Sequence, residues 1–450
     1  MGRLFGTDGA RGIANSELTC ELAMNIGKAA AMVLLDTESN SRPVILIGKD
    51  TRLSSDMLEG ALSAGICSVG ADVIRLGTVP TPAVAFLVRE YNASAGIMIS
   101  ASHNPHEFNG IKIFNSDGYK LPDALEDQIE SIVLDHAEPY PVPTGAALGK
   151  VSYRHKAIDD YVNHIAESID GDLSGLNVAI DCSNGSASAT AEKLFKLLGA
   201  ECHIMSNKPD GVNINEKCGS THMEKLIEYV KQNDVDCGVA FDGDADRCLA
   251  VDENGNLVDG DFILAICAKD LKERGLLNNN TVVGTVMTNM GFNRFCEDNN
   301  IDFASTGVGD RYVLENMLEN DYSLGGEQSG HVIFLDYGTT GDGQLTGAQL
   351  MSIIKRSNKK LSELAKVMQR YPQVLINVRI SNEHKLKFYT DKAIKAEIEK
   401  VKEQLTNRGR ILVRASGTEP LIRVMLEGED YKEISDIANS VADLIRERLG

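Results

Sequence analysis

Short apolar runs, rich in β-branched residues, alternate with amphipathic helical patterns along most of the chain. The runs predict buried strands at residues 44–48, 95–99, 177–180, 238–241 and 282–286. The stretches between them predict helices, for example at residues 57–69, 190–198 and 262–272. Such alternation is typical of α/β units with largely parallel sheets. Functional loops are then expected just after the carboxyl ends of the strands.

Shifts in composition mark breaks in this pattern. The segment 139–150 is rich in Pro, Gly and Ala without periodicity, which indicates a linker. A hairpin turn near residues 254–255 suggests another break. Near residues 371–372 the pattern changes to strand, helix, strand, strand, helix, which predicts a small α+β domain.

The chain is acidic, with 45 Lys and Arg against 65 Asp and Glu and a formal net charge of −20. This surplus argues against nucleic acid or anionic lipid as the main partner. Nine cysteines stand singly, without a C-x-x-C pair. The start has no apolar stretch of the signal-peptide type, and no run reaches the roughly 18 apolar residues of a membrane span. We therefore predict a cytoplasmic protein with reduced thiols and no membrane association.

Ser102 is a candidate nucleophile. It lies in Ile-Ser-Ala-Ser-His-Asn-Pro, directly after the predicted strand 95–99, with His103 and Asn104 beside it. An ordinary turn is the simpler interpretation, since Ser, Asn and Pro are common turn residues. Serine hydrolase chemistry would instead require G-x-S-x-G, which is absent here.

Three aspartates at alternate positions follow the predicted strand 238–241: Asp242, Asp244 and Asp246. Their mutual repulsion favours a bound cation, and oxygen ligands suit Mg²⁺. An EF-hand loop is the main competitor, because Glu253 falls at its twelfth position. However, Arg247 stands where that loop needs Gly, and strands flank the segment. A solvated acidic turn and an aspartate-nucleophile phosphatase, which usually has Thr in place of Asp246, are weaker alternatives.

Three further loops could bind a phosphorylated ligand. The segment 325–331 carries Glu327 and Ser329 among glycines, although a plain hairpin turn explains it equally well. The segment 414–420 and Arg423 combine arginines, hydroxyls and a glycine, as in a phosphate cradle. Near the start, glycines surround Arg11, and Lys112 offers another cation near Ser102. An acidic protein needs such local positive clusters to bind an anion.

Together these loops resemble the α-D-phosphohexomutase superfamily. The matching motifs occur in the family's order, at residues 6–12, 100–105, 242–247, 326–331 and 414–423. The resemblance implies an α/β fold, with three related mixed or parallel α/β domains and a smaller C-terminal α+β domain around a central cleft. With the breaks described above, it predicts domains at 1–150, 151–254, 255–370 and 371–450.

The resemblance also implies chemical roles. Ser102 would be phosphorylated, and one Mg²⁺ per active site would be held by a phosphoserine oxygen and Asp242, Asp244 and Asp246. The groups around the transferring phosphoryl group would be Arg11, His103, Lys112 and Arg247. Lys112 and His331 are both candidates for the general base. The mechanism implies a sugar 1,6-bisphosphate as intermediate and activator.

The implied partner is a small phosphosugar, and a homodimer is possible. The residues that would recognise the sugar are Thr306, Gly307, Asp310, Arg311, Glu327 and Ser329. Those that would hold the non-reacting phosphate are Arg414, Ser416, Gly417, Thr418 and Arg423. One position departs from the pattern, because Phe108 stands where an Asp is common before Asn-Gly-Ile-Lys. Glu107 beside it is the possible substitute.

Overall fold

The chain forms two compact units in a computed structural model that describes residues 2–6, 8–34, 42–406, 408–416 and 420–450. The first unit combines Met1–Met287 with Ile301–Val367, and the second combines Thr288–Asn300 with Met368–Gly450. Within the described residues, no helix is both long and apolar enough to cross a membrane.

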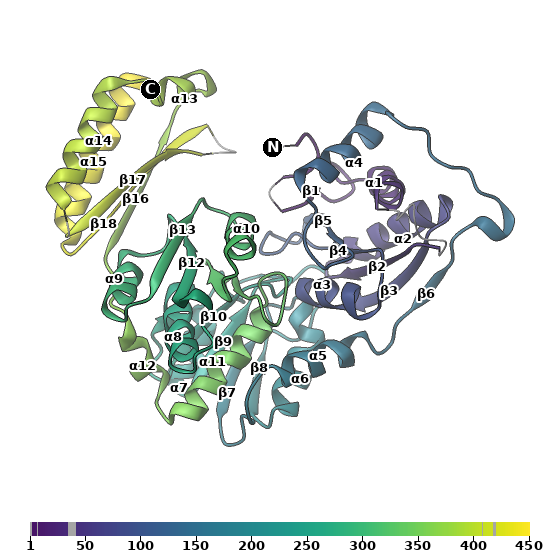
Figure 1. The fold of residues 1–450 in the computed structure, drawn as a ribbon, viewed down its shortest axis with the longest axis horizontal. Helices are drawn as coiled ribbons and strands as arrows, with labels where there is room; N and C mark the ends of the chain where they lie inside the picture. Colours follow the sequence, from purple (N-terminus) through teal and green to yellow (C-terminus); the bar gives the residue numbers. More distant parts are fainter. Residues whose placement is uncertain (1, 7, 35–41, 407, 417–419) are drawn as a thin grey trace. The chain divides into compact units, whose positions relative to one another are not determined.

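The first sheet of the first unit has six strands and is mixed (Figure 1). Its order is β1 (Ala10–Ile13), β5 (Phe108–Asn115), β4 (Ala95–Ile99), β2 (Val44–Lys49), β3 (Asp72–Thr78) and β6 (Val151–Tyr153). Strands β4, β2, β3 and β6 are parallel, whereas β5 and β1 run antiparallel to their neighbours. The accompanying helices are α1 (Cys20–Val33), α2 (Leu53–Ser68), α3 (Thr81–Glu90) and α4 (Asp123–Asp135).

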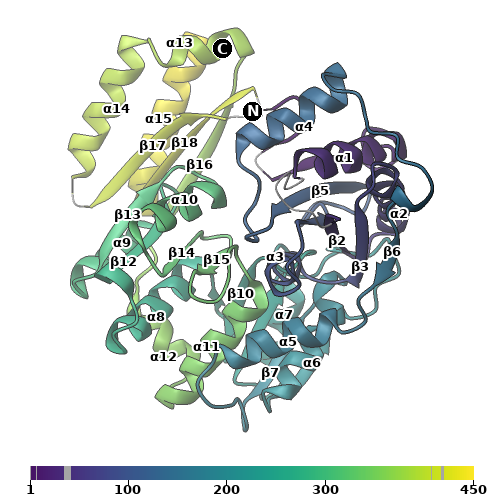
Figure 2. The same cartoon turned by 45° about the vertical axis from the view of Figure 1, so that its right-hand side comes forward.

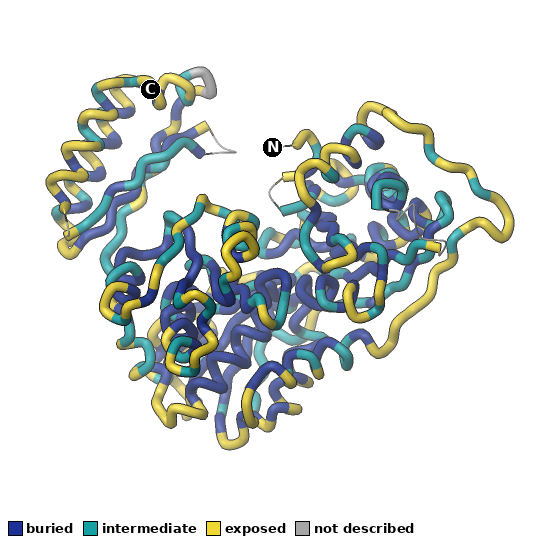
Figure 3. The backbone as a smooth tube through the Cα atoms, in the orientation of Figure 1, coloured by how far each residue is buried: buried dark blue, intermediate teal, exposed yellow. Residues whose placement is uncertain are grey.

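The second sheet has five strands, of which three are parallel and two form an antiparallel edge. Its order is β11 (Leu257–Val258), β10 (Cys248–Asp252), β9 (Cys237–Phe241), β7 (Asn177–Asp181) and β8 (Glu201–Met205). Its helices are α5 (Ala157–Glu167), α6 (Ala191–Leu197) and α7 (Glu224–Gln232). Every residue of β9 is buried, as its dark tube in Figure 3 shows.

The third sheet has four strands in the order β13 (Asp302–Thr306), β12 (Thr281–Thr285), β14 (Leu324–Gly326) and β15 (Val332–Phe334). Only the β14–β15 pair is antiparallel among its described pairings. The helices of this part are α8 (Gly260–Glu273), α10 (Asp310–Asn320), α11 (Gly343–Ser357) and α12 (Leu361–Leu364). Short 3₁₀ turns lie at Gly145–Ala147, Ser186–Ala189, Asn278–Asn280 and Ala365–Val367.

The second unit is built on an antiparallel sheet in the order β16 (Gln373–Arg379), β18 (Leu421–Gly428) and β17 (Gly409–Ala415). Its helices are α9 (Met290–Asp298), α13 (Asn382–Phe388), α14 (Lys392–Leu405) and α15 (Tyr431–Leu449), with α14 and α15 packed on the strands (Figure 2). Buried Glu427 fastens α9 to this sheet, because it accepts hydrogen bonds from the Met290 N–H (2.9 Å) and from Arg410 Nε (2.7 Å).

The predicted α/β architecture is confirmed, and the predicted strands differ from the observed ones by at most a residue at each end. Helix α2 is the larger difference, since it begins at Leu53 rather than at residue 57. Leu53 is 71% exposed, so the first turn lacks the apolar face that periodicity detects. In the C-terminal part, two helices rather than one separate β16 from β17.

Candidate active site

Ser102 stands in a strained turn immediately after β4. Its φ is +52°, in the left-handed region that non-glycine residues rarely adopt, and it is 1% exposed. Its Oγ donates a hydrogen bond to Asp242 Oδ2 at 2.6 Å. Asp242 follows β9 of another sheet, so the carboxyl ends of β4 and β9 meet at this point. The structure therefore joins the predicted nucleophile to the predicted metal loop.

The buried guanidinium of Arg52 binds the backbone carbonyls of the Ser102 turn. Arg52 Nη2 donates to the carbonyls of Ser102 and Asn104, both at 2.9 Å, and Nη1 donates to the carbonyl of Pro105 at 2.6 Å. Its Nε pairs with Asp50 Oδ2 at 2.8 Å, and neither side chain is exposed. Because these three hydrogen bonds all end on carbonyls of one turn, Arg52 can hold Ser102 in its uncommon conformation.

Asp50, Arg52 and Asn215 support the Ser102 turn and were not among the predicted site residues. Asp50 and Arg52 follow the carboxyl end of β2, which is the position where functional side chains are expected, so a signal was present. Asn215, whose Nδ2 also donates to the Ser102 carbonyl at 2.9 Å, gave no such signal. It lies in an irregular stretch far from Ser102 in sequence.

We expect Arg52→Lys to lower the free energy of unfolding by about 3 kcal/mol, because a lysine cannot replace the forked contacts and leaves buried carbonyls without donors. Urea unfolding of both proteins measures this change. Arg42→Lys is the matched control, since Arg42 also binds two carbonyls (Leu148 and Ala146, both 2.7 Å) but is solvent-exposed. Equal losses in the two variants would contradict this role of Arg52.

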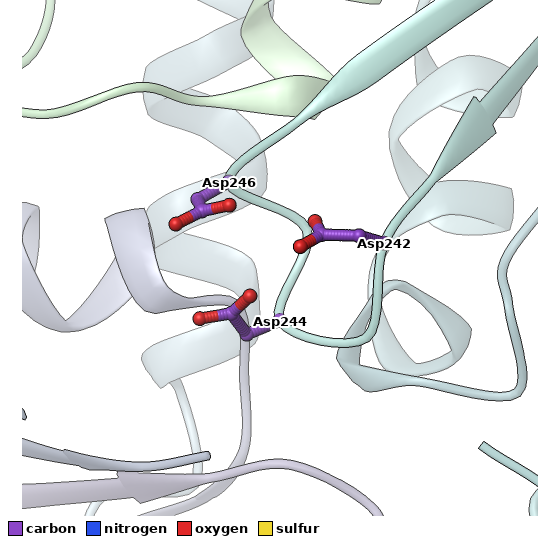
Figure 4. Close-up of side chains that lie close together, drawn as sticks. All are labelled: Asp242, Asp244 and Asp246. Atoms are coloured by element: carbon purple, nitrogen blue, oxygen red, sulfur yellow. The ribbon is translucent and has the colours of Figure 1, made fainter. Parts of the chain in front are cut away.

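The three aspartates form one buried cluster at the end of β9. Their carboxylates offer oxygen atoms within 4.8 Å of one another, and Figure 4 shows them turned toward a common point. Asp244 Oδ1 and Asp246 Oδ1 are buried and have no hydrogen-bond partner among the described residues. Burial, with the neighbouring Asp246 and Asp244 charges, raises the pKa of Asp242 well above its ordinary value. Oxygen-only ligands with unsatisfied buried atoms fit Mg²⁺.

The EF-hand alternative does not agree with this geometry. Strands β9 and β10 flank the aspartates as an antiparallel pair, whereas an EF-hand needs helices. Glu253 turns elsewhere and accepts hydrogen bonds from the backbone N–H and the hydroxyl of Ser362.

Lys112 neutralises part of this acidic cluster. Its Nζ lies 2.7 Å from Asp244 Oδ2 and 3.6 Å from Asp246 Oδ2, and its side chain is almost wholly buried. Burial opposes the charge, but the attraction of Asp244, Asp8 and Asp246 outweighs it and raises the pKa of Lys112. Lys112 is therefore a charged group here, suited to neutralising a phosphoryl group.

His331 lies on the other side of Asp246. Its Nδ1 is 3.7 Å from Asp246 Oδ2 and its Nε2 is 3.7 Å from Asp310 Oδ2. Burial opposes protonation, whereas the two carboxylates outweigh it and raise the pKa of His331. The Gly341 N–H donates to Nε2 at 3.0 Å, a contact that requires the neutral ring. The imidazole thus has partners for both of its protonation states.

His103 and Arg247 lie beside the Ser102 hydroxyl. Arg247 Nη1 donates to His103 Nδ1 at 3.2 Å, and that nitrogen lies 3.4 Å from Ser102 Oγ. Burial, followed by the Arg247 and Arg11 charges, lowers the pKa of His103 to about 4, so the ring is neutral at pH 7. The Nε atoms of Arg11 and Arg247 are buried and without acceptors among the described residues. These donors suit a bound phosphoryl group.

The predicted sugar loop and the Glu327 loop lie together. The Gly309 N–H donates to Glu327 Oε1 at 3.1 Å, and Thr306 Oγ1 donates to the Gly284 carbonyl at 3.0 Å. Ser329 Oγ is buried without a hydrogen-bond partner among the described residues, so it can bind a ligand hydroxyl. A cavity of about 350 Å³ adjoins the sugar loop, and Gly309, Asp310 and Arg311 form part of its lining. Gly307, in the same loop, does not line the cavity.

In the second unit, Arg414 on β17 stands directly opposite Arg423 on β18. Burial and the Arg423 charge lower the pKa of Arg414. Like charges opposite one another destabilise a strand pair, so the arrangement favours an anion. Lys385, which was not among the predicted site residues, donates to the Ser416 carbonyl at 2.8 Å. The predicted ligands Gly417 and Thr418 lie outside the described residues.

Phe108, the departure noted in the sequence, is the first residue of β5 and pairs with Ile13. The Glu107 carbonyl accepts a hydrogen bond from the Ala14 N–H at 2.9 Å, and its exposed side chain lies 3.5 Å from His106 Nδ1. Phe108 therefore serves the register of the β1–β5 pair.

Four family models match the chain in order. They describe phosphoglucomutase/phosphomannomutase alpha/beta/alpha domains I, II and III, at residues 2–139, 159–255 and 259–371, and the C-terminal domain, at residues 375–444. With the buried triad and the adjoining serine, these matches show that the chain belongs to the phosphoglucomutase/phosphomannomutase family. The resemblance to phosphohexomutases is confirmed.

Among curated relatives, the phosphoglucosamine mutase of Acetivibrio thermocellus is 57% identical over 450 residues, which is the full length of both chains. That of Clostridium botulinum (strain Kyoto / Type A2) is 56% identical over the same coverage. A phosphoglucomutase/phosphomannomutase family protein of Burkholderia thailandensis shares the fold, with a TM-score of 0.84, 24% identity and coverage of 99% and 98%. Aspergillus fumigatus N-acetylphosphoglucosamine mutase, solved with GlcNAc-6P and magnesium, has a TM-score of 0.70 and 17% identity. The match covers 99% of this chain and 95% of that one.

Proposed function

We propose that this enzyme interconverts glucosamine 6-phosphate and glucosamine 1-phosphate, as an isomerase that transfers phosphate within the sugar. The full-length identity of 57% to a phosphoglucosamine mutase supports the choice of sugar. The observation that carries the chemistry is the 2.6 Å contact between Ser102 Oγ and Asp242, in a cluster that also holds the Lys112–Asp244 ion pair and the Arg247–His103 contact. The product would feed the synthesis of amino-sugar nucleotides and cell-wall precursors.

The reaction needs two phosphoryl transfers. Phosphorylated Ser102 gives its group to the C1 hydroxyl of glucosamine 6-phosphate: the O1–P bond forms, the Oγ–P bond breaks, and the hydroxyl proton passes to the neutral ring of His331. Of the two candidates for the general base, Lys112 is already protonated and cannot accept it. The resulting 1,6-bisphosphate reorients. Its 6-phosphate then returns to Ser102, the O6–P bond breaks, O6 takes up the proton, and glucosamine 1-phosphate leaves.

The protein contributes positioning and charge, because phosphoryl transfer asks little covalent work of it. Asp242, Asp244 and Asp246, with a phosphoserine oxygen, would hold Mg²⁺, which neutralises charge on the transferring group. Arg11, His103 and Arg247 would orient that group by hydrogen bonds. For the sugar we propose Thr306, Gly307, Asp310, Arg311, Glu327 and Ser329, and for the non-reacting phosphate Arg414, Ser416, Gly417, Thr418 and Arg423.

Phosphorus NMR tests the function, with glucosamine, glucose or mannose 6-phosphate incubated in parallel with enzyme, Mg²⁺ and a trace of sugar 1,6-bisphosphate. We expect the 1-phosphate to form fastest from glucosamine 6-phosphate. Faster turnover of glucose or mannose phosphate would assign the enzyme to the phosphoglucomutase/phosphomannomutase subgroup instead. Release of inorganic phosphate alone would indicate a metal-dependent phosphatase, and binding without turnover a sugar-phosphate sensor. Light scattering tests the expected homodimer.

A further inference from the structure

Lys120 joins two loops that are far apart in the sequence. Its Nζ donates to Asp8 Oδ1 at 2.7 Å and to Asp310 Oδ2 at 2.5 Å. Asp8 lies in the turn before β1, the strand that carries Arg11, and the side chains of Asp8 and Arg11 form an ion pair. Asp310 ends the proposed sugar loop and opens α10. One mostly buried ammonium group thus connects a loop at the phosphoryl site with a loop at the sugar site.

These contacts extend into a closed ring of charges. Lys112 Nζ lies 3.2 Å from Asp8 Oδ2 and 3.6 Å from Asp246 Oδ2. His331 then connects Asp246 to Asp310, with 3.7 Å on each side. We call this set the charge ring, and its members in order are Lys112, Asp8, Lys120, Asp310, His331 and Asp246. Acidic and basic groups alternate around it.

The members of the charge ring depend on one another. Burial opposes the charge of Lys120, but Asp310 and Asp8 outweigh it and raise the pKa of Lys120. Burial likewise opposes the charge of Asp8, whereas Lys112, Lys120 and Arg11 outweigh it and hold the pKa of Asp8 well below its usual range. Apolar packing often stabilises a protein as well as buried ion pairs do, so stability alone does not explain such a ring. Positioning explains the ring better, because each ammonium group holds two carboxylates of the ring in place.

We propose that Lys120 is a positioning residue, which holds the sugar loop at Asp310 in register with the phosphoryl-transfer groups around Asp8. This inference rests on the proposed function and gives roles to Lys120 and to Asp8, for which the resemblance implied none. The position of the sugar loop matters for the rate, because a displacement of about 1 Å from near-attack geometry can slow a reaction about 100-fold. Through Asp310, Lys120 acts on the sugar without being required to touch it.

The test begins with Lys120→Met, which keeps the length of the side chain and removes its charge. We expect kcat/KM for the phosphosugar to fall about 100-fold, with a raised KM, and Lys120→Arg to recover most of the loss because a guanidinium also bridges two carboxylates. Lys49→Met is the matched control. Lys49 also bridges two carboxylates, Asp56 and Glu59, and is 15% exposed against 17% for Lys120. It should lose stability but keep kcat/KM.

A double-mutant cycle separates positioning from general destabilisation. If Lys120 acts through Asp310, Lys120→Met combined with Asp310→Asn should be about as slow as the slower single variant. Losses that multiply would overturn the proposal, as would a Lys120→Met enzyme with unchanged kcat/KM or an equal loss in Lys49→Met. The wild type is assayed in parallel with each sugar phosphate. A wild type without mutase activity would refute the proposed function, whereas an active wild type matched by Lys120→Met would refute only the role of Lys120.

Discussion

Replacing Ser102 by alanine is expected to abolish phosphosugar isomerisation, with kcat lowered by about 10⁴-fold or more. The reason is covalent, since Oγ is the atom that accepts and returns the phosphoryl group in the proposed mechanism. The variant should still fold, because it loses only the hydrogen bond to Asp242, whereas the contacts of Arg52 and Asn215 with the Ser102 carbonyl remain. Phosphorus NMR measures turnover, and mass spectrometry of intact protein shows whether phosphate is still attached.

Ser63→Ala is the control for the Ser102 variant. Ser63 is a buried serine of the same domain, on helix α2, and its Oγ donates to the Glu59 carbonyl at 2.7 Å. This variant should keep full turnover. Full activity in Ser102→Ala, or phosphate found on a different residue, would mean that the phosphoserine mechanism is wrong.

Magnesium should stabilise the protein, and Asp242→Asn should remove that response. At a concentration of 100 times its Kd, an ion that binds only the folded state adds about 2.7 kcal/mol. The variant lacks one ligand charge, so we expect no rise of its Tm with Mg²⁺ and a kcat on the order of 10³-fold lower, since a catalytic metal supplies several kcal/mol. Thermal unfolding in EDTA and in Mg²⁺ measures the first effect, and the NMR assay the second.

Glu253→Gln is the matched control, because an EF-hand would require this carboxylate and the observed cluster does not contain it. Its Mg²⁺ response should equal that of the wild type. A Tm rise that persists in Asp242→Asn would place the metal elsewhere, and a loss of the rise in Glu253→Gln would restore the EF-hand interpretation.

Sequence patterns were sufficient for the parts of the site that lie next to strands. Buried strands are short apolar runs, and loops at their carboxyl ends meet at one sheet edge. For this reason Ser102, after β4, and the Asp242 loop, after β9, could both be chosen before their contact was seen. The same reasoning applied to β2 would have drawn attention to Asp50 and Arg52.

The remaining contacts depend on tertiary pairing, which local patterns do not contain. Lys120 lies in a polar turn after β5, where a lysine is ordinary, and its partner Asp310 is 190 residues away. Asn215 reaches Ser102 from a stretch without regular structure. The start of α2 was missed for a different reason, since an exposed Leu53 breaks the apolar periodicity.

Because Glu427 binds α9 to the C-terminal sheet, one proteolytic cleavage cannot separate the second unit intact. The second unit contains two separate stretches of chain, so a single protease cleavage near Val367 would release the sheet but leave α9 behind. The freed fragment would keep a buried carboxylate that has lost its donor at Met290. To recover the whole unit, the chain would have to be cleaved before α9, after α9 and near Val367. An insertion or a fusion partner is therefore better placed in the exposed segment 139–150 than at the apparent start of the last domain.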